Sequence, residues 1–276
     1  MSTLYVVATP IGNLEDITFR AIRVLGEVSV IAAEDTRTTR KLLTRYAIKA
    51  SLVSYYDGNR DMRIPYLLKR LEDSDVALVS EAGVPVIRDP GQHLVDAAAK
   101  AGHAIVTIPG PSAVTAALAV AGMSAGEFLF LGFLPSRREE RRRKLEEVSD
   151  ELRTLVVFEA PHRLRASLAD MVGVLGAQRP AVVCRELTKM YEEVHRGTLG
   201  DALAHFATPR GEFTLVIAGA PENAEAEQLD MDEVLDDLRR LKSAGAPAKE
   251  AMAWMGRHYG MSHRKVYEMW LSLSRP

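Results

Sequence analysis

The stretch that decides the fold reads Ala77-Leu78-Val79-Ser80-Glu81-Ala82-Gly83-Val84-Pro85-Val86-Ile87-Arg88-Asp89-Pro90-Gly91. Its first three residues continue an apolar run from Val76, a pattern typical of a strand buried in a parallel sheet. The following residues are rich in Gly, Pro and acidic side chains, and an amphipathic helix is expected from near His93. An open α/β sheet binds its ligand beyond the carboxyl ends of its strands. An ordinary strand-to-helix connection is the alternative, but such connections run about 2–6 residues, so we expect a functional loop here.

Composition places the chain among ordinary globular proteins. It has 276 residues, 47% hydrophobic and 26% charged, which is enough for about two domains. The net charge of −2 means that a nucleic acid would have to bind to a local patch. Cys184 is the single cysteine, which fits a reducing compartment, and no signal peptide or membrane-spanning run is evident, so we expect a cytoplasmic protein. The seven histidines have no metal-ligand spacing, so we expect no metal.

Strands and helices alternate over the first part of the chain, which predicts a mostly parallel α/β sheet. The expected strands cover residues 4–8, 28–33, 51–54, 76–79 and 104–108. Unusual loops follow four of them: Pro10–Leu14, Glu34–Arg37, Glu81–Gly91 and Pro109–Ser112. Because the carboxyl ends of parallel strands share one edge, these loops should converge on one ligand site. None of them carries a Gly-x-Gly-x-x-Gly or P-loop lysine motif, which argues against a dinucleotide and against phosphoryl transfer.

A second α/β domain is expected to follow, and then a helical tail. We place the domains at residues 1–120 and 121–222, with a linker and tail at 223–276. Residues 197–206 look helical, although 192–198 could instead form a hairpin. The run Arg137–Lys144 is either a solvated helix face or a phosphate-contacting segment. The tail should form three helices, over 231–241, 247–258 and 262–273, with Ser262 as a cap. They could be a helix-turn-helix unit or a docking bundle.

Six short motifs in register give the sequence a family resemblance over residues 4–221. They are Thr9-Pro10-Ile11-Gly12-Asn13-Leu14, Ala33-Glu34-Asp35-Thr36-Arg37, Pro109-Gly110-Pro111-Ser112-Ala113, Gly132-Phe133-Leu134-Pro135, Glu159-Ala160-Pro161-His162-Arg163-Leu164 and Arg185-Glu186-Leu187-Thr188-Lys189. With these motifs the chain resembles the ribosomal RNA small subunit methyltransferase I group of the tetrapyrrole methylase superfamily.

The resemblance implies a reaction and a cofactor. Members of that group transfer a methyl group from S-adenosylmethionine to the ribose 2′-oxygen of a cytidine in the decoding region of 16S rRNA. The implied architecture is two α/β domains with the cofactor in the cleft between them, usually in a homodimer. The implied cofactor-binding residues are Pro10, Gly12, Ala82, Gly83, Val84, Val86, Ser112, Ala113, Phe133, Leu134, Phe158, Glu159, Ala160, Ala220 and Pro221.

The opening stretch departs from the family pattern, which is close to Ser-Asp-Ala-Gly-Thr-Pro-x-Ile-Ser-Asp-Pro-Gly. This chain has Glu81 for the first Asp, Val84 for the Thr and Arg88 for the second Ser. A hydroxyl contact at position 84 is lost, and Arg88 places a cation near a site for a sulfonium unless Asp89 or Glu81 neutralises it.

A ribose hydroxyl is a poor nucleophile while it keeps its proton, so a general base is expected. Asp35, Glu81 and Glu186 are the candidates, and we rank Asp35 first. The alternative for each is to cap a helix or to pair with a neighbouring arginine. The basic residues expected to hold phosphate are Arg37, Arg141, Arg142, Arg143, Arg163, Arg185 and Lys189.

Three functions stay open at this point. The first is the rRNA 2′-O-methyltransferase, acting on 16S rRNA or the assembled small subunit. The second is a small-molecule methylase of the tetrapyrrole type, for which the Arg137–Lys144 run has no use. The third is a catalytically silent RNA- or cofactor-binding protein, which the changed 81–88 loop makes conceivable.

Overall fold

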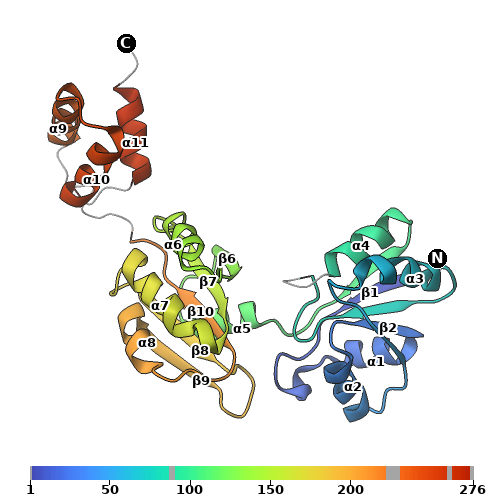
Figure 1. The fold of residues 1–276 in the computed structure, drawn as a ribbon. Helices are drawn as coiled ribbons and strands as arrows, with labels where there is room; N and C mark the ends of the chain where they lie inside the picture. The colour runs from blue at the N-terminus through green and yellow to red at the C-terminus, as the bar shows by residue number, and fades with distance from the viewer. Residues whose placement is uncertain (1, 87–90, 222–230, 260–262, 274–276) are drawn as a thin grey trace. The chain divides into compact units, whose positions relative to one another are not determined.

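The computed structural model describes residues 2–86, 91–221, 231–259 and 263–273 (Figure 1). Packing divides the chain into two compact units. The first comprises residues 1–146 and 153–218, and the second comprises 147–152 and 219–276. The first unit holds two β-sheets, and the second holds the helices of the tail. Within the described ranges, none of the helices combines the length and the apolarity that crossing a bilayer demands.

The first sheet has five strands, all parallel, as the sequence predicts. Their spatial order is β3-β2-β4-β1-β5. The strands are β1 (Thr3–Val7), β2 (Val30–Ala33), β3 (Ser51–Ser54), β4 (Val76–Val79) and β5 (Ala104–Ile108). The elements between them are η1 (Leu14–Asp16), α1 (Phe19–Glu27), α2 (Thr36–Arg45), α3 (Arg60–Asp73) and α4 (Gly91–Lys100).

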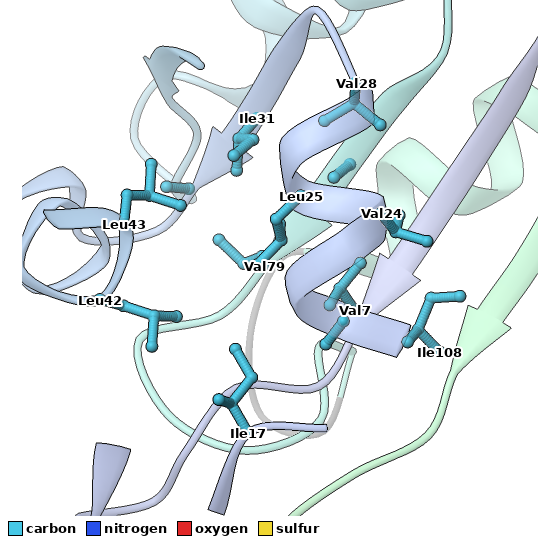
Figure 2. Packing of buried hydrophobic residues seen from close by; sticks show 13 residues of the cluster. Val7, Ile17, Val24, Leu25, Val28, Ile31, Leu42, Leu43, Val79 and Ile108 are labelled. Carbon is cyan, nitrogen blue, oxygen red and sulfur yellow. The ribbon is translucent and has the colours of Figure 1, made fainter. Parts of the chain in front are cut away.

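Helices cover both faces of this sheet because side chains alternate along each strand. Ile31 and Val79 face α1 and α2, where they pack with Leu25 and Leu42 (Figure 2). The alternate strand residues face α3 and α4 and pack around Leu67. Neighbouring strands β1 and β4 therefore lead to helices on opposite faces. Such a switch point is where open α/β sheets form their ligand crevice.

The second sheet is mixed. Its order is β6-β7-β10-β8-β9, and only β6 and β7 pair in parallel. The strands are β6 (Phe128–Phe133), β7 (Thr154–Glu159), β8 (Pro180–Arg185), β9 (Glu193–Thr198) and β10 (Phe213–Ile217). The helix expected over 197–206 is shorter, α8 (Leu199–His205), because β9 pairs with β8 through Thr198. The alternative of a hairpin is therefore confirmed.

Helix α5 (Ala113–Ala121) follows the first sheet in sequence but packs on the second, through Val114 and Leu118. Residue 120, where we place the end of the first domain, thus lies inside a helix that belongs to the core of the second sheet. Helix α7 (Pro161–Leu175) packs against β7, and both α6 (Arg138–Glu146) and α8 pack against α7.

The second unit contains three helices in its described part, at the positions that the sequence predicts. They are α9 (Met231–Ser243), α10 (Ala248–Tyr259) and α11 (His263–Ser272). Val234, Leu238, Met252, Met255 and Val266 form their own small core. Most of the predicted linker and the predicted cap Ser262 lie outside the described residues.

Candidate active site

A cavity of about 540 Å³ lies where the strands of the first sheet end. All four loops that the sequence singles out contribute to its wall. They supply Pro10–Gly12 and Leu14 after β1, Glu34 after β2, Ser80–Val84 after β4, and Ser112 before α5. Pockets of 300–1,000 Å³ are the size that binds small molecules and cofactors.

Residues around the second sheet supply the rest of the wall. They are Phe133 at the end of β6, Phe158–Pro161 at the end of β7, Cys184, Leu187 and Lys189 around the end of β8, and Glu212–Thr214 at the start of β10. The rings of Phe133 and Phe158 meet edge to face with centroids 5.7 Å apart. The wall therefore combines flat apolar surfaces with carboxylates and one ammonium group.

Gly12 allows the two parts of the wall to approach each other closely. A Cβ on Gly12 would lie 2.8 Å from Thr188 Oγ1 and 3.0 Å from the Leu187 carbonyl oxygen, so any larger residue would push these loops apart. The neighbouring Asn13 N–H donates to Thr188 Oγ1 at 3.0 Å.

The backbone of the loops has further features that bear on the site. The loops after β1 and β4 exchange backbone hydrogen bonds between Thr9 and Gly83, at 2.9 and 3.0 Å. Gly83 has a φ of +81°, which glycine adopts without strain. Thr188 has a φ of +68°, unfavourable for a β-branched residue. Strain of this kind gathers at functional sites.

Asp35, the first-ranked general base, caps a helix instead. Its carboxylate accepts from the backbone N–H groups of Arg37 and Thr38 at the start of α2, at 2.7 and 3.3 Å. The Arg37 guanidinium donates to it at 3.0 Å. The side-chain bond from Arg37, with the backbone bonds, lowers the pKa of Asp35 to about 2. Asp35 is not among the residues of the cavity wall.

The other two candidate bases differ in their surroundings. Glu81 lines the cavity with an exposed side chain, and its backbone N–H donates to Glu34 Oε2 at 3.2 Å. Glu186 lies outside the cavity wall and accepts from Lys189 Nζ and from the Glu212 N–H, each at 2.9 Å. Burial alone would raise the pKa of Glu186, but these hydrogen bonds lower it below its usual value.

Most of the predicted cofactor-binding residues meet in this cavity. Those in its wall are Pro10, Gly12, Ala82, Gly83, Val84, Ser112, Ala113, Phe133, Phe158, Glu159 and Ala160. Val86 and Leu134 are not in the wall, and Leu134 instead offers its carbonyl oxygen to Arg163. Ala220 and Pro221 fall in the second unit, so their role stays a prediction. Arg88 and Asp89 lie outside the described residues.

Two of the predicted phosphate ligands make contacts inside the protein, and for the buried Arg141 this corrects the prediction. The Arg141 guanidinium is buried and donates to Asp170 on α7 at 2.6 Å and to the carbonyl oxygens of Pro135 and Ser136. The Arg163 guanidinium donates to the carbonyl oxygens of Leu134 and Pro135 and lies 3.3 Å from the buried Glu159 carboxylate. The Arg141 side chain is 6% exposed, so its guanidinium is not available to RNA. Arg163 is 22% exposed, and its role as a phosphate ligand stays a prediction.

The remaining predicted cations keep varying degrees of exposure. Arg37 and Arg143 are exposed, and Arg142 is half-buried, 3.9 Å from Asp170. Arg185 donates to Glu193 and to the Arg210 carbonyl oxygen. Lys189 lines the cavity between Glu186 and Glu212. Burial alone would lower the pKa of Lys189, but these carboxylates raise it above its usual value.

Sequence reasoning missed several residues of the wall. Glu34 belongs to one of the four loops that the sequence singles out, but it is not among the residues predicted to bind the cofactor or to act as the base. Thr38 lies one turn further along, on α2. Glu212 and Thr214 gave no such signal, because they begin an antiparallel strand. No group of three or more metal-ligating side chains occurs among the described residues.

Comparisons with known proteins agree with this architecture. The model of the tetrapyrrole (corrin/porphyrin) methylases matches residues 3–203. A ribosomal RNA small subunit methyltransferase I from Halalkalibacterium halodurans is 44% identical over 97% of this chain and 94% of its own length. Another, from Thermotoga maritima, is 46% identical over 79% of this chain and 99% of its own length.

A solved structure shares the fold. It is a uroporphyrin-III C-methyltransferase from Thermus thermophilus in complex with S-adenosylhomocysteine, 18% identical, with a TM-score of 0.57. The similarity covers 79% of this chain and 97% of that one. The chain belongs to the tetrapyrrole methylase family and, within it, to the group of the ribosomal RNA small subunit methyltransferases I.

Proposed function

We propose that this chain is an S-adenosylmethionine-dependent methyltransferase that modifies 16S rRNA, at the ribose 2′-oxygen of a cytidine in the decoding region. The observation that carries the proposal is the near full-length similarity to relatives with that name, at 44% identity. The cavity supports it independently, because it offers one site of suitable size to which loops from both sheets contribute.

The residues present fit S-adenosylmethionine. Backbone at Gly12 and Gly83 can approach a ligand closely, and the Phe133 and Phe158 rings offer apolar surface to an adenine. The carboxylates of Glu34 and Glu81 suit ribose hydroxyls or a cationic centre. When bound, S-adenosylmethionine supplies a methyl group already activated by its sulfonium sulfur. Val84 stands in this wall where the family pattern has Thr, and a contact through its backbone would not depend on the lost hydroxyl.

The remaining task of the protein is to align the ribose oxygen and to remove its proton. Well-oriented intramolecular reactions show that alignment can supply roughly 7–11 kcal/mol. We assign the general base to Glu81, because it is the one of the three candidates that lies in the cavity wall. Its carboxylate would take the proton of the 2′-hydroxyl, a contribution of about 10²- to 10⁴-fold. Asp35 instead orders the start of α2, and Glu186 holds Lys189.

We further propose that the enzyme works in the cytoplasm as a homodimer without a metal, on free 16S rRNA or on the assembled small subunit. These proposals rest on the family resemblance and, for the metal, on the spacing of the histidines.

Nucleoside mass spectrometry tests the substrate. 16S rRNA from a strain that lacks this protein should lose a 2′-O-methylcytidine peak, and the purified protein with S-adenosylmethionine should restore it. An unchanged peak would contradict the RNA substrate and favour a small-molecule methylase. Calorimetry with millimolar S-adenosylmethionine provides the second arm, since absence of binding would favour a silent RNA-binding protein.

A further inference from the structure

Helix α2 presents a continuous basic face next to the cavity. Arg37, Arg40, Lys41 and Arg45 are exposed. Arg37, Lys41 and Arg45 are four residues apart and Arg40 is three residues after Arg37, so the four side chains share one side of the helix. The opposite side carries Leu42 and Leu43, which are buried in the core of the first sheet (Figure 2). These four cations form what we call the α2 basic face.

The charges of this face are not neutralised from within the helix. Residues 36–45 contain no acidic side chain. Arg37 contacts the Asp35 carboxylate, yet its side chain is 89% exposed. No ion pair to Arg40, Lys41 or Arg45 occurs among the described residues. On α1 of the same sheet face, by contrast, Arg23 is paired with Glu27 at 2.8 Å.

Helix α6, the other arginine-rich helix, is a poorer candidate for an RNA contact. Glu139, Glu140 and Glu146 lie among its basic residues, and Arg141 is buried. Arg138 and Arg142 both lie within ion-pair distance of Asp170. Three of its arginines therefore surround one carboxylate at the contact between α6 and α7.

The α2 basic face begins at the wall of the cavity in which we propose that the reaction occurs. Thr38, on the first turn of α2, lines the cavity, and so does Glu34 just before the helix. Lys41 lies one turn beyond Thr38. A ten-residue helix spans about 15 Å, which is the length of about four stacked nucleotide steps. Because the protein has a net charge of −2, a polyanion such as RNA would have to bind to a local basic patch of this kind.

We propose that the α2 basic face binds the phosphates of the rRNA strand that flanks the target nucleotide, with Arg40, Lys41 and Arg45 as the main contacts. The identity of the RNA rests on the proposed function. Phosphate contacts of this kind fix the register of the strand and carry no sequence information themselves.

The test measures how binding of a fluorescent 16S rRNA fragment from the decoding region depends on salt. In the full-length variant Arg40→Gln/Lys41→Gln/Arg45→Gln, the slope of log K against log salt should fall by about two, and affinity at 0.1 M salt by about 100-fold. The matched control, Lys69→Gln/Arg70→Gln/Lys100→Gln, removes the same charge from α3 and α4 on the opposite face of the sheet. It should keep the wild-type slope.

An unchanged slope in the α2 variant, or an equal fall in the control, would overturn the proposal. Binding of S-adenosylmethionine should stay at the wild-type level in both variants. With saturating rRNA the α2 variant should also keep its kcat while its KM for rRNA rises. Failure of the proposed function is visible separately, because the wild-type protein would then transfer no methyl group to 16S rRNA, whatever the salt slopes of the variants.

Discussion

At the scale of single residues, carboxylates in similar sequence positions have different surroundings. Glu81 follows β4 and Asp35 follows β2, but only Glu81 lines the cavity. We expect Glu81→Gln to lower kcat by about 10²- to 10⁴-fold. Calorimetric affinity for S-adenosylmethionine should change little. Asp35→Asn is the matched control, because asparagine also caps helices well and should preserve turnover. A loss of turnover confined to the Asp35 variant would return the role of base to Asp35.

The pKa of Asp35 predicts a pH dependence of stability. Because its folded-state pKa of about 2 lies below the unfolded value, the carboxylate stabilises the fold above about pH 4. That stabilisation is lost as the pH falls toward 2. The Tm of wild type should therefore exceed that of Asp35→Ala at pH 6 by about 2–4 °C, and the gap should narrow as the pH falls from 4 toward 2. A gap that is the same at pH 6 and pH 2 would show that the ionised carboxylate is not what stabilises the cap.

At the scale of helices and loops, the cluster of Arg138, Arg141 and Arg142 around Asp170 joins α6 to α7. Arg141 and Asp170 are 6% and 4% exposed, with a distance of 2.6 Å between Nη2 and Oδ2. Asp170→Asn leaves a buried guanidinium without its carboxylate, so we expect a loss of about 3–5 kcal/mol in urea denaturation. Arg138→Gln removes a 75% exposed member of the same cluster and should cost less than about 1 kcal/mol. Equal losses would contradict a buried structural pair.

The loop after β1 offers a second test at this scale. Gly12→Ala inserts a methyl group against Thr188 Oγ1 and the Leu187 carbonyl oxygen, an overpacking that costs about 1–3 kcal/mol. Affinity for S-adenosylmethionine should fall about tenfold or more in calorimetry, because the two loops of the wall must separate. Gly26→Ala, in helix α1 with nothing near its added Cβ, should leave affinity unchanged. Wild-type affinity in the Gly12 variant would mean that the contact between these loops does not shape the site.

Elements differ in how far the sequence predicts them. The parallel sheet and the convergence of its loops follow from local patterns, because each strand is a short apolar run and its loop follows directly. The pairing of β9 with β8 was harder to predict, because residues 197–206 have helical character while the strand depends on a partner elsewhere. The structural role of Arg141 is hard to predict for a similar reason. Its carboxylate partner Asp170 is 29 residues away in the sequence. The residues next to Arg141 and Asp170 form no pattern that indicates this contact.

At the scale of the whole molecule, the cavity and the tail belong to different compact units. Every residue of the cavity wall lies between Pro10 and Thr214, in the first unit. The three tail helices have a core of their own, around Leu238 and Met255. The Thermotoga maritima relative matches over 99% of its own length but over only 79% of this chain, so a member of the group is shorter by about the size of this tail.

A chain that ends after Pro221 should therefore fold and bind S-adenosylmethionine within about twofold of the full-length affinity, as expected for independent parts. Calorimetry measures this directly. A second chain, ending after Ala218, also removes Ala220 and Pro221, which the family resemblance assigns to the cofactor. We expect it to bind at least about tenfold more weakly. Equal binding by both truncated chains would remove Ala220 and Pro221 from the site, and failure of the longer one would make the tail part of it.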